Sequence, residues 1–120
     1  MSTHPVYDRI LESITDDTVR DVYCQIRDSH GKDHAISKES VSLVIWQKYT
    51  PSTDRVIREC VEILHETYGV PICSNSGRAG YYMPANRAEL DEYLAEMRSR
   101  RNKIDTTLRK LETSARTWDY

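Results

Sequence analysis

Cysteine is scarce in this sequence, and its three copies, Cys24, Cys60 and Cys73, lie far apart. This number and spacing suit neither a disulfide framework nor a zinc knuckle. The histidines have no ligand spacing with the cysteines, so we expect reduced thiols and no metal or other cofactor. No apolar run is long enough to cross a bilayer, and the N-terminus lacks the pattern of a signal peptide. We therefore expect a cytoplasmic protein without a membrane partner.

The sequence also lacks an excess of either charge and any motif of a catalytic site. Its formal net charge is −2, with acidic residues crowding the first third and basic residues gathering near the C-terminus. Such a division allows a local basic face despite the acidic total. There is no glycine-rich phosphate loop, no motif pairs a nucleophile with a base, and the Asp16-Asp17 pair suits the first turn of a helix. We therefore expect no enzymatic activity.

The first half of the chain predicts three helices from the spacing of its apolar residues. The first covers residues 6–14, Thr15 caps the second, and Ser37 caps the third after a polar loop at residues 29–35. The apolar residues that we expect to face the core are Val6, Ile10, Ile14, Val19, Val22, Tyr23, Ile26, Val41, Val44 and Ile45. The three helices together predict one small helical core.

A fourth helix begins near Pro51. Proline suits the first turn of a helix, with Thr50 as its N-cap and Ser52 as the rival cap. The apolar seam of this helix consists of Ile57, Val61 and Leu64. Gly69 follows the last apolar residue of the seam, at the position where a left-handed residue ends many helices. The fourth helix is therefore expected to end just before Gly69.

Two short β-prone segments follow, at residues 70–74 and 81–84. The turn-rich stretch between them holds Arg78 between two glycines, and this order predicts a two-stranded hairpin. Tyr81 and Tyr82 point to opposite faces of a strand because they are adjacent. At least one of these tyrosines is therefore expected to pack on the core.

The C-terminal quarter of the chain predicts one long helix. Asn86 suits its N-cap, Glu89 completes a capping box, and the helix is expected to run to about Ala115. Leucines and similar residues alternate at spacings of four and three, which is the pattern of a coiled-coil seam. The seam residues are Leu90, Leu94, Met97, Arg101, Ile104, Leu108, Leu111 and Ala115. We expect this seam to hold a homodimer together.

Arg101 interrupts the seam, because it meets its own copy in a parallel dimer. Arg100 and Asp105 attract one another across a parallel pair, so the two features disagree and the orientation of the helices stays open. The alternative to a dimer is packing of the seam on the protein's own N-terminal helix at residues 6–14. Both arrangements are compatible, with the near half of the seam inside and the far half in a dimer.

The order helix, polar loop, helix, short turn, helix and hairpin is that of a winged helix-turn-helix. Residues 34–46 and 52–84 resemble type 11 helix-turn-helix domains and the N-terminal domain of the biotin repressor, a pattern common in phage and prophage proteins. The run from Tyr68-Gly69-Val70-Pro71-Ile72 to Gly80-Tyr81-Tyr82 carries the resemblance, which covers roughly residues 15–84. Residues 47–52 lack the glycine or small residue of the family's turn, so we expect an irregular corner there.

The resemblance implies that the fourth helix enters the major groove of DNA and that the hairpin contacts the flanking groove or backbone. The residues that we expect to contact DNA are Ser52, Thr53, Arg55, Arg58, Ser76 and Arg78. The hydroxyls suit a phosphate at a helix N-terminus, and Arg55 and Arg58 suit guanine. Asp54 and Glu59 are expected to limit indiscriminate phosphate binding. Alternatively, the two arginines form a solvated face paired with Glu59 and Glu62.

These observations predict a mainly α protein with a small β-hairpin, a winged helix-turn-helix followed by a coiled-coil helix. The expected parts are an N-terminal extension (1–14), the winged domain (15–85), the dimerisation helix (86–116) and a frayed tail (117–120). The expected function is dimeric, sequence-specific binding of double-stranded DNA, as a transcriptional regulator or a phage replication or recombination accessory factor. The alternative is a protein–protein interaction module on a coiled-coil scaffold, which the acidic net charge favours.

Overall fold

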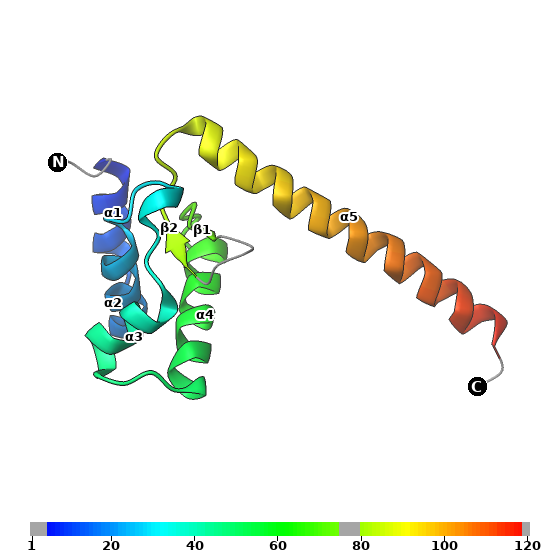
Figure 1. Ribbon diagram of the computed structural model, residues 1–120, viewed down its shortest axis with the longest axis horizontal. Coiled ribbons are helices and arrows are strands. Elements are labelled where there is room, and N and C mark those ends of the chain that lie inside the picture. The colour runs from blue at the N-terminus through cyan, green and yellow to red at the C-terminus, as the bar shows by residue number, and fades with distance from the viewer. Residues whose placement is uncertain (1–4, 75–79, 119–120) are drawn as a thin grey trace. The chain divides into compact units, whose positions relative to one another are not determined.

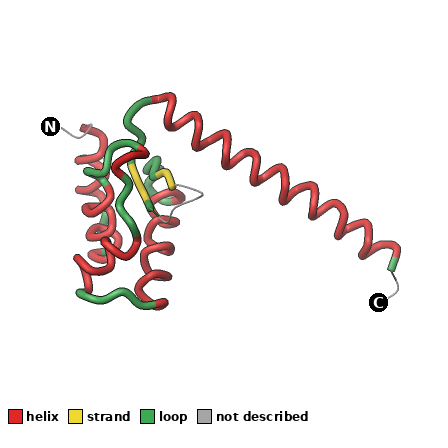
Figure 2. The backbone as a smooth tube through the Cα atoms, in the orientation of Figure 1, coloured by secondary structure: helices red, strands yellow, loops and turns green. Residues whose placement is uncertain are grey.

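The computed structural model describes residues 5–74 and 80–118, with side chains from residue 8 onward. Five α-helices and a two-stranded antiparallel hairpin make up most of this part of the chain (Figures 1 and 2). The expected mainly α chain with a small hairpin and a long C-terminal helix is confirmed. The chain divides into two compact units, Met1–Leu90 and Asp91–Tyr120. Among the described helices, none has an apolar stretch sufficient to cross a membrane.

The helices begin where local capping groups satisfy their first backbone amides. Their bounds are α1 Pro5–Ser13, α2 Asp17–Ile26, α3 Lys38–Trp46, α4 Pro51–Glu66 and α5 Arg87–Thr117, with a short 3-10 turn at Lys32–His34. The N-caps predicted at Ser37 and Thr50 are confirmed, since each side chain accepts a hydrogen bond from the third residue of its helix. The cap predicted at Thr15 is wrong. Asp16 caps α2 instead, because its carboxylate accepts from the Val19 amide at 3.0 Å.

One hydrophobic core fills the first unit. Helix α2 contacts both α3 and α4, and α1 contacts α2. The core residues are Ile14, Val19, Val22, Tyr23, Ile26, Val41, Ile57, Cys60, Val61, Leu64, Val70, Ile72 and Met83. Ile10 on α1 is partly buried and packs against this core, and Ile14, which directly follows α1, is fully buried in it. The Val6 side chain lies outside the described side chains.

The expectation that Val44 faces the core is wrong, because its side chain is 57% exposed. Val41 and Ser42 are buried, and Ile45 and Trp46 are half-buried. The buried face of α3 therefore runs along positions 41, 42, 45 and 46, and Val44 lies about 100° away from its neighbour Ile45 around the helix. An apolar residue at the predicted spacing thus lies on the solvent side.

The hairpin consists of strands β1 (Cys73–Ser74) and β2 (Tyr81–Tyr82), which pair Cys73 with Tyr82 and Ser74 with Tyr81. The strands are shorter than predicted. Tyr82 is buried and Tyr81 half-buried, so the expectation that at least one packs on the core is confirmed.

The segment between α2 and α3 also pairs with β2, which the sequence did not predict. Ile36 and Tyr81 exchange two backbone hydrogen bonds of 2.8 Å in an antiparallel bridge. Farther along, the Gly31 amide donates to the Met83 carbonyl at 2.8 Å. A Cβ placed on Gly80 would lie 3.2 Å from the Cβ of Ala35, so this close approach favours glycine. The loop expected at 29–35 therefore forms part of the hairpin's support.

Helix α4 ends at Glu66, earlier than predicted, and the left-handed glycine predicted after it follows three residues later. Gly69 has φ +64°, the Val70 amide donates to the Leu64 carbonyl at 3.0 Å, and the Gly69 amide donates to the His65 carbonyl at 3.2 Å. These bonds satisfy carbonyls that the last turn of a helix leaves open. The turn directs the chain from α4 into the hairpin.

At the start of α5, the Asn86 cap is confirmed, because its side chain accepts from the Glu89 amide at 3.0 Å. The capping box is different from the prediction. The Glu89 carboxylate accepts from the Ala85 amide at 3.0 Å and from the Lys32 amide at 3.3 Å, so it joins the 3-10 turn to the residues before α5. The helix runs to Thr117, two residues beyond the expected end, and Asp119 and Tyr120 lie outside the described residues.

Candidate nucleic-acid interface

Helices α3 and α4 are joined by the four residues 47–50. Gln47 ends α3 in the left-handed conformation (φ 57°, ψ 23°), where glycine is the usual residue. Its side-chain amide donates to the Val44 carbonyl at 3.2 Å, and its backbone amide donates to the Leu43 carbonyl at 3.0 Å. The irregular corner expected between residues 47 and 52 is therefore located at Gln47.

The first turn of α4 uses most of its hydrogen-bonding groups internally. The Thr53 amide donates to the Thr50 hydroxyl at 3.1 Å, and the Thr50 amide donates to the Thr53 hydroxyl at 2.9 Å. Ser42 on α3 donates to the Thr53 hydroxyl at 2.7 Å and also contacts the Lys48 carbonyl. Pro51 has no amide hydrogen. This capping box and its link to Ser42 fix the start of α4 against α3.

Thr53 is only 6% exposed, and its hydroxyl is enclosed by these bonds. The phosphate contact that we expected from Thr53 is therefore incompatible with this arrangement, and its side chain instead holds α4 in place. Ser52 is exposed. Its hydroxyl and backbone amide are the groups of this turn that remain without a partner among the described residues. A phosphate approaching α4 thus meets Ser52 rather than Thr53.

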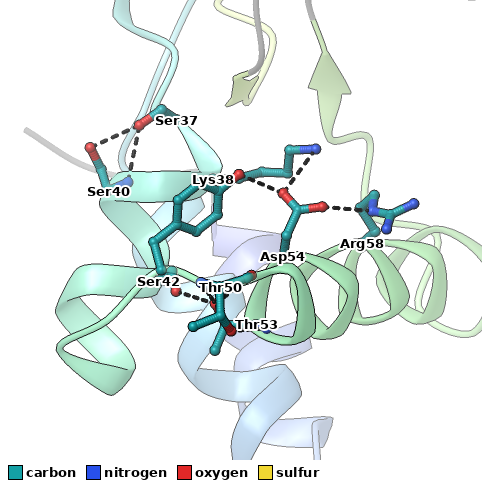
Figure 3. A network of polar contacts seen from close by, with 9 residues as sticks. Ser37, Lys38, Ser40, Ser42, Thr50, Thr53, Asp54 and Arg58 are labelled. Atoms are coloured by element: carbon teal, nitrogen blue, oxygen red, sulfur yellow. Dashed lines mark hydrogen bonds and ion pairs between the residues drawn. The ribbon is translucent and has the colours of Figure 1, made fainter.

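The Asp54 carboxylate forms hydrogen bonds and ion pairs with residues from three different segments (Figure 3). The Tyr49 hydroxyl donates to Oδ1 at 2.7 Å, and the Lys38 ammonium lies 3.2 Å from the same oxygen. The Arg58 Nε donates to Oδ2 at 3.0 Å. The Asp54 side chain is 19% exposed, whereas that of Arg58 is 57% exposed. Asp54 therefore ties the start of α3, the connecting turn and the second turn of α4 to one carboxylate.

This arrangement shifts the pKa of both Asp54 and Tyr49. The hydrogen bond from Tyr49 lowers the pKa of Asp54, and Lys38 and Arg58 act in the same direction, although partial burial opposes them. The same hydrogen bond raises the pKa of Tyr49, because removing its proton would leave a phenolate beside a carboxylate. At neutral pH the cluster therefore holds an ionised Asp54 and a protonated Tyr49.

Arg58 is held by its Nε, so its two terminal nitrogens are left for another partner. In Figure 3 the guanidinium lies beyond Asp54 with these nitrogens directed away from the carboxylate. Arg55, one turn earlier on α4, is exposed and makes no ion pair with a residue that the structure describes. The predicted alternative, in which the arginines pair with Glu59 and Glu62, is not the arrangement found, because Arg58 pairs with Asp54.

The rest of the exposed face of α4 carries the opposite charge. Glu59, Glu62 and Glu66 are all exposed on its second half. A phosphate backbone is attracted to the first half of the helix and repelled by the second half. The surface around Ser52, Arg55 and Arg58, called the α4 basic turn below, is therefore small and bounded by acidic residues.

The structure brings together Ser52, Arg55 and Arg58 on one helix, whereas Ser76 and Arg78 lie outside the described residues. Lys38 and Tyr49 position the site through their contacts with Asp54, although no pattern in the sequence points to them. The four-residue spacing of Asp54 and Arg58 was a usable indication of their ion pair. No comparable spacing connects Lys38 or Tyr49 with Asp54, because these residues are brought together only by the α3–α4 packing.

The remaining candidate chemistry is limited. Cys60 and Cys73 are buried, Cys24 is half-buried, and none forms a disulfide. Burial raises the pKa of the Cys60 thiol to about 11, which disfavours its reactive thiolate. Within residues 5–74 and 80–118, no three histidine, cysteine or acidic side chains are grouped to hold a metal ion.

No family model, curated protein or solved structure matches this chain.

Proposed function

We propose that this chain is a dimeric, sequence-specific DNA-binding protein of the winged helix-turn-helix kind, with α4 as its recognition helix. The observation that carries the proposal is Arg58, which Asp54 holds at 3.0 Å through Nε while its side chain stays 57% exposed. A side chain already fixed in one orientation loses less conformational freedom on binding. Arg55 and Ser52 lie on the same exposed end of α4.

The surrounding fold supports this proposal. Helix α3, a four-residue turn and α4 are followed by a hairpin, which is the element order of winged helix-turn-helix domains. In such domains the N-terminal residues of the recognition helix contact base edges, and here they are the residues of the α4 basic turn. Arg55 and Arg58 each suit a bidentate contact to guanine, and Ser52 suits a backbone phosphate. Because the second half of α4 is acidic, we expect only the first half of the helix to approach the DNA closely.

A dimer is part of the proposal because the seam of α5 is largely exposed in the single chain. Ile104 is 68% exposed and Leu111 is 62% exposed, and Met97 and Leu108 are also exposed. A stripe of this kind is buried most simply by a second copy. Changing Leu108 and Leu111 together to Asp is expected to give monomers with the first unit intact, measured by light scattering and circular dichroism.

The test of DNA recognition begins with selection of bound fragments from random duplex DNA, followed by anisotropy titrations with the selected site. Arg55→Ala and Arg58→Ala are each expected to weaken specific binding by about 10- to 100-fold. Arg9→Ala removes the same charge from α1 and serves as the control, with little expected effect. Affinity should fall steeply as salt is raised. The absence of duplex binding at low salt, or equal losses in all three variants, would contradict the proposal.

A protein-binding module is the second candidate, and one observation favours it. Leu43 and Val44 are both exposed on α3, and α4, which packs on α3, carries three exposed glutamates. A surface with exposed aliphatic and acidic residues suits a partner with an apolar and basic surface. If the selection yields no DNA, Leu43→Ser with Val44→Ser should abolish capture of a protein partner, whereas Arg55→Ala should leave that capture unchanged.

A further inference from the structure

We infer that the α5 helices of two copies pair antiparallel, about a two-fold axis that passes between Asn102 and Lys103. This inference rests on the proposed dimer and specifies its geometry. The evidence is the pattern of charges beside the seam of α5, together with the place of Arg101 within it. Both can be compared for each possible pairing of two identical helices.

Two rows of residues flank the seam. One row consists of the residues that directly follow every second seam residue, beginning with Leu90: Asp91, Arg98, Asp105 and Glu112. The other row consists of the residues that directly precede the remaining seam residues, beginning with Leu94: Tyr93, Arg100, Thr107 and Ser114. In a parallel pair the two different rows face each other, whereas in an antiparallel pair each row faces its own copy. The first row is the charged one, so it decides the antiparallel register.

The proposed register places residues whose numbers add to 205 opposite each other in the seam. Leu94 then packs on Leu111 of the second copy, and Met97 packs on Leu108. Arg101 shares its layer with Ile104 of the second copy, so the two Arg101 side chains lie in neighbouring layers, about 4.5 Å apart along the coil, rather than in one layer. The long side chain of Arg101 extends past Ile104 to solvent, which is how arginine is accommodated at the edge of an apolar surface.

The same register brings Arg98 opposite Asp105 of the second copy, and the two-fold axis repeats this pair. These two attractive pairs lie close to the centre of the coil. Asp91 and Glu112 face each other at the two ends, where solvent screens their repulsion. Sliding one helix by a heptad places Arg98 or Asp105 opposite its own copy on the axis. The heptad shift that pairs Arg98 with Glu112 also leaves Met97 against the small Ala115.

A parallel pair has one comparable advantage and one larger cost. It gains two Arg100–Asp105 pairs, but it places Arg101 of both copies in the same core layer. Asp105 also pairs with Arg109 at 2.8 Å within its own helix, and this competition for the carboxylate is the same in both arrangements. Two buried like charges cost more than two exposed ion pairs contribute. The antiparallel arrangement is therefore favoured, and the two chains enter the coil from opposite ends.

Distances between spin labels test this geometry in the full chain. Thr113 and Ser99 are exposed on the side of α5 away from the seam. In an antiparallel pair, labels at Thr113→Cys are separated by about 32 Å along the coil and those at Ser99→Cys by about 10 Å, at 1.5 Å per residue. In a parallel pair the two sites give nearly equal distances. Replacing Cys24 with serine removes the half-buried native thiol, and Cys60 and Cys73 stay buried.

A much longer distance at Thr113 than at Ser99 supports the inference. Equal distances at the two sites would overturn it in favour of a parallel dimer, and the absence of any inter-label distance would overturn it together with the proposed dimer. A loss of DNA binding with the distances intact would instead contradict only the DNA proposal. These outcomes separate the geometry of the coil from the proposed function.

A charge exchange provides a second measurement that needs no label. Arg98→Asp is expected to raise the dimer Kd by about tenfold, since two attractive pairs become repulsive ones. Adding Asp105→Arg to the same chain should restore the affinity. The matched control is the chain with Arg100→Asp and Asp105→Arg, which should not regain the wild-type affinity. The reverse result, with restoration by the Arg100 exchange alone, would refute the antiparallel register.

Discussion

Replacing Asp54 with asparagine tests the centre of the α3–α4 contact. The change removes one negative charge while keeping a side chain of the same size. Lys38 and Asp54 are both about four-fifths buried, with side chains 21% and 19% exposed, and their ion pair contributes on the order of 1 kcal/mol. The more exposed Arg58 contributes about 0.5 kcal/mol. The expected loss is therefore about 1.5 kcal/mol, or a fall in Tm of about 6 to 12 °C for a unit of this size.

The pH dependence of this loss identifies its origin. The folded-state pKa of Asp54 is lowered, so its contribution is fully present above the pKa of the unfolded chain. It is lost as the pH falls through the folded-state pKa, which places the change below about pH 4. The difference in Tm between the wild-type protein and Asp54→Asn should therefore be largest at pH 7 and should close under acidic conditions.

Thermal unfolding followed by circular dichroism at pH 7 and at pH 3 measures this difference. Asp21→Asn is the matched control, because Asp21 is an exposed acid on α2 and its replacement should change the stability by less than about 0.5 kcal/mol. A difference for Asp54→Asn that is the same at both pH values would refute the ionic explanation. A difference no larger than that of the control at pH 7 would refute the role of Asp54 altogether.

Three further predictions concern the first unit. Ile57→Ala should cost about 2 to 5 kcal/mol in urea unfolding, because the side chain is fully buried, whereas Ile57→Val should cost about 1 kcal/mol. Gln47 and Gly69 both have left-handed backbone conformations. Gln47→Gly should therefore raise the stability by about 0.5 to 1 kcal/mol, and Gly69→Ala should lower it by about 1 kcal/mol. A change of the opposite sign at either position would contradict this interpretation of the backbone. Cys60 should react with iodoacetamide at pH 8 only after unfolding, with Cys24 modified first in mass-spectrometric peptide maps, because the Cys60 pKa is about 11.

Much of the helical structure follows from local chemistry. Ser37, Thr50, Gly69 and Asn86 were identifiable from the sequence because a cap depends on a few neighbouring residues. Thr15 was a wrong choice because an aspartate at the next position is an equally good cap. The helix then starts one residue later.

The non-local features were not predictable in the same way. The bridge between Ile36 and Tyr81 joins residues 45 positions apart, and the polar composition of residues 29–35 gave no indication of it. Val44 has the spacing of a core residue, but the buried face of α3 does not extend to it, so its side chain stays exposed to solvent. The spacing gives the pattern of a face, whereas tertiary packing decides which part of that pattern is covered.

The candidate site shows the same division. The sequence placed Arg55 and Arg58 on one helix, but it treated Asp54 only as a charge that repels phosphate. The structure gives Asp54 a second role, since its carboxylate orients Arg58 and also binds Lys38 and Tyr49. Thr53 lies inside the capping box for a reason that depends on Ser42, a residue eleven positions earlier on another helix. Such roles become visible only when two elements are packed together.

The pairing of Ile36 with Tyr81 has a mechanical consequence. Ile36 directly precedes Ser37, the cap of α3, and Lys38 follows with its ion pair to Asp54. Residues 36–38 thus connect β2 of the hairpin to Asp54 on α4 through three consecutive positions. A hinge motion of the hairpin relative to α4 therefore strains the backbone bonds of Ile36 at one end or the ion pair of Lys38 at the other. A force on the hairpin is therefore transmitted to Asp54 and Arg58 along the backbone of residues 36–38, in addition to the packing of Ile36 and Tyr81 on the hydrophobic core.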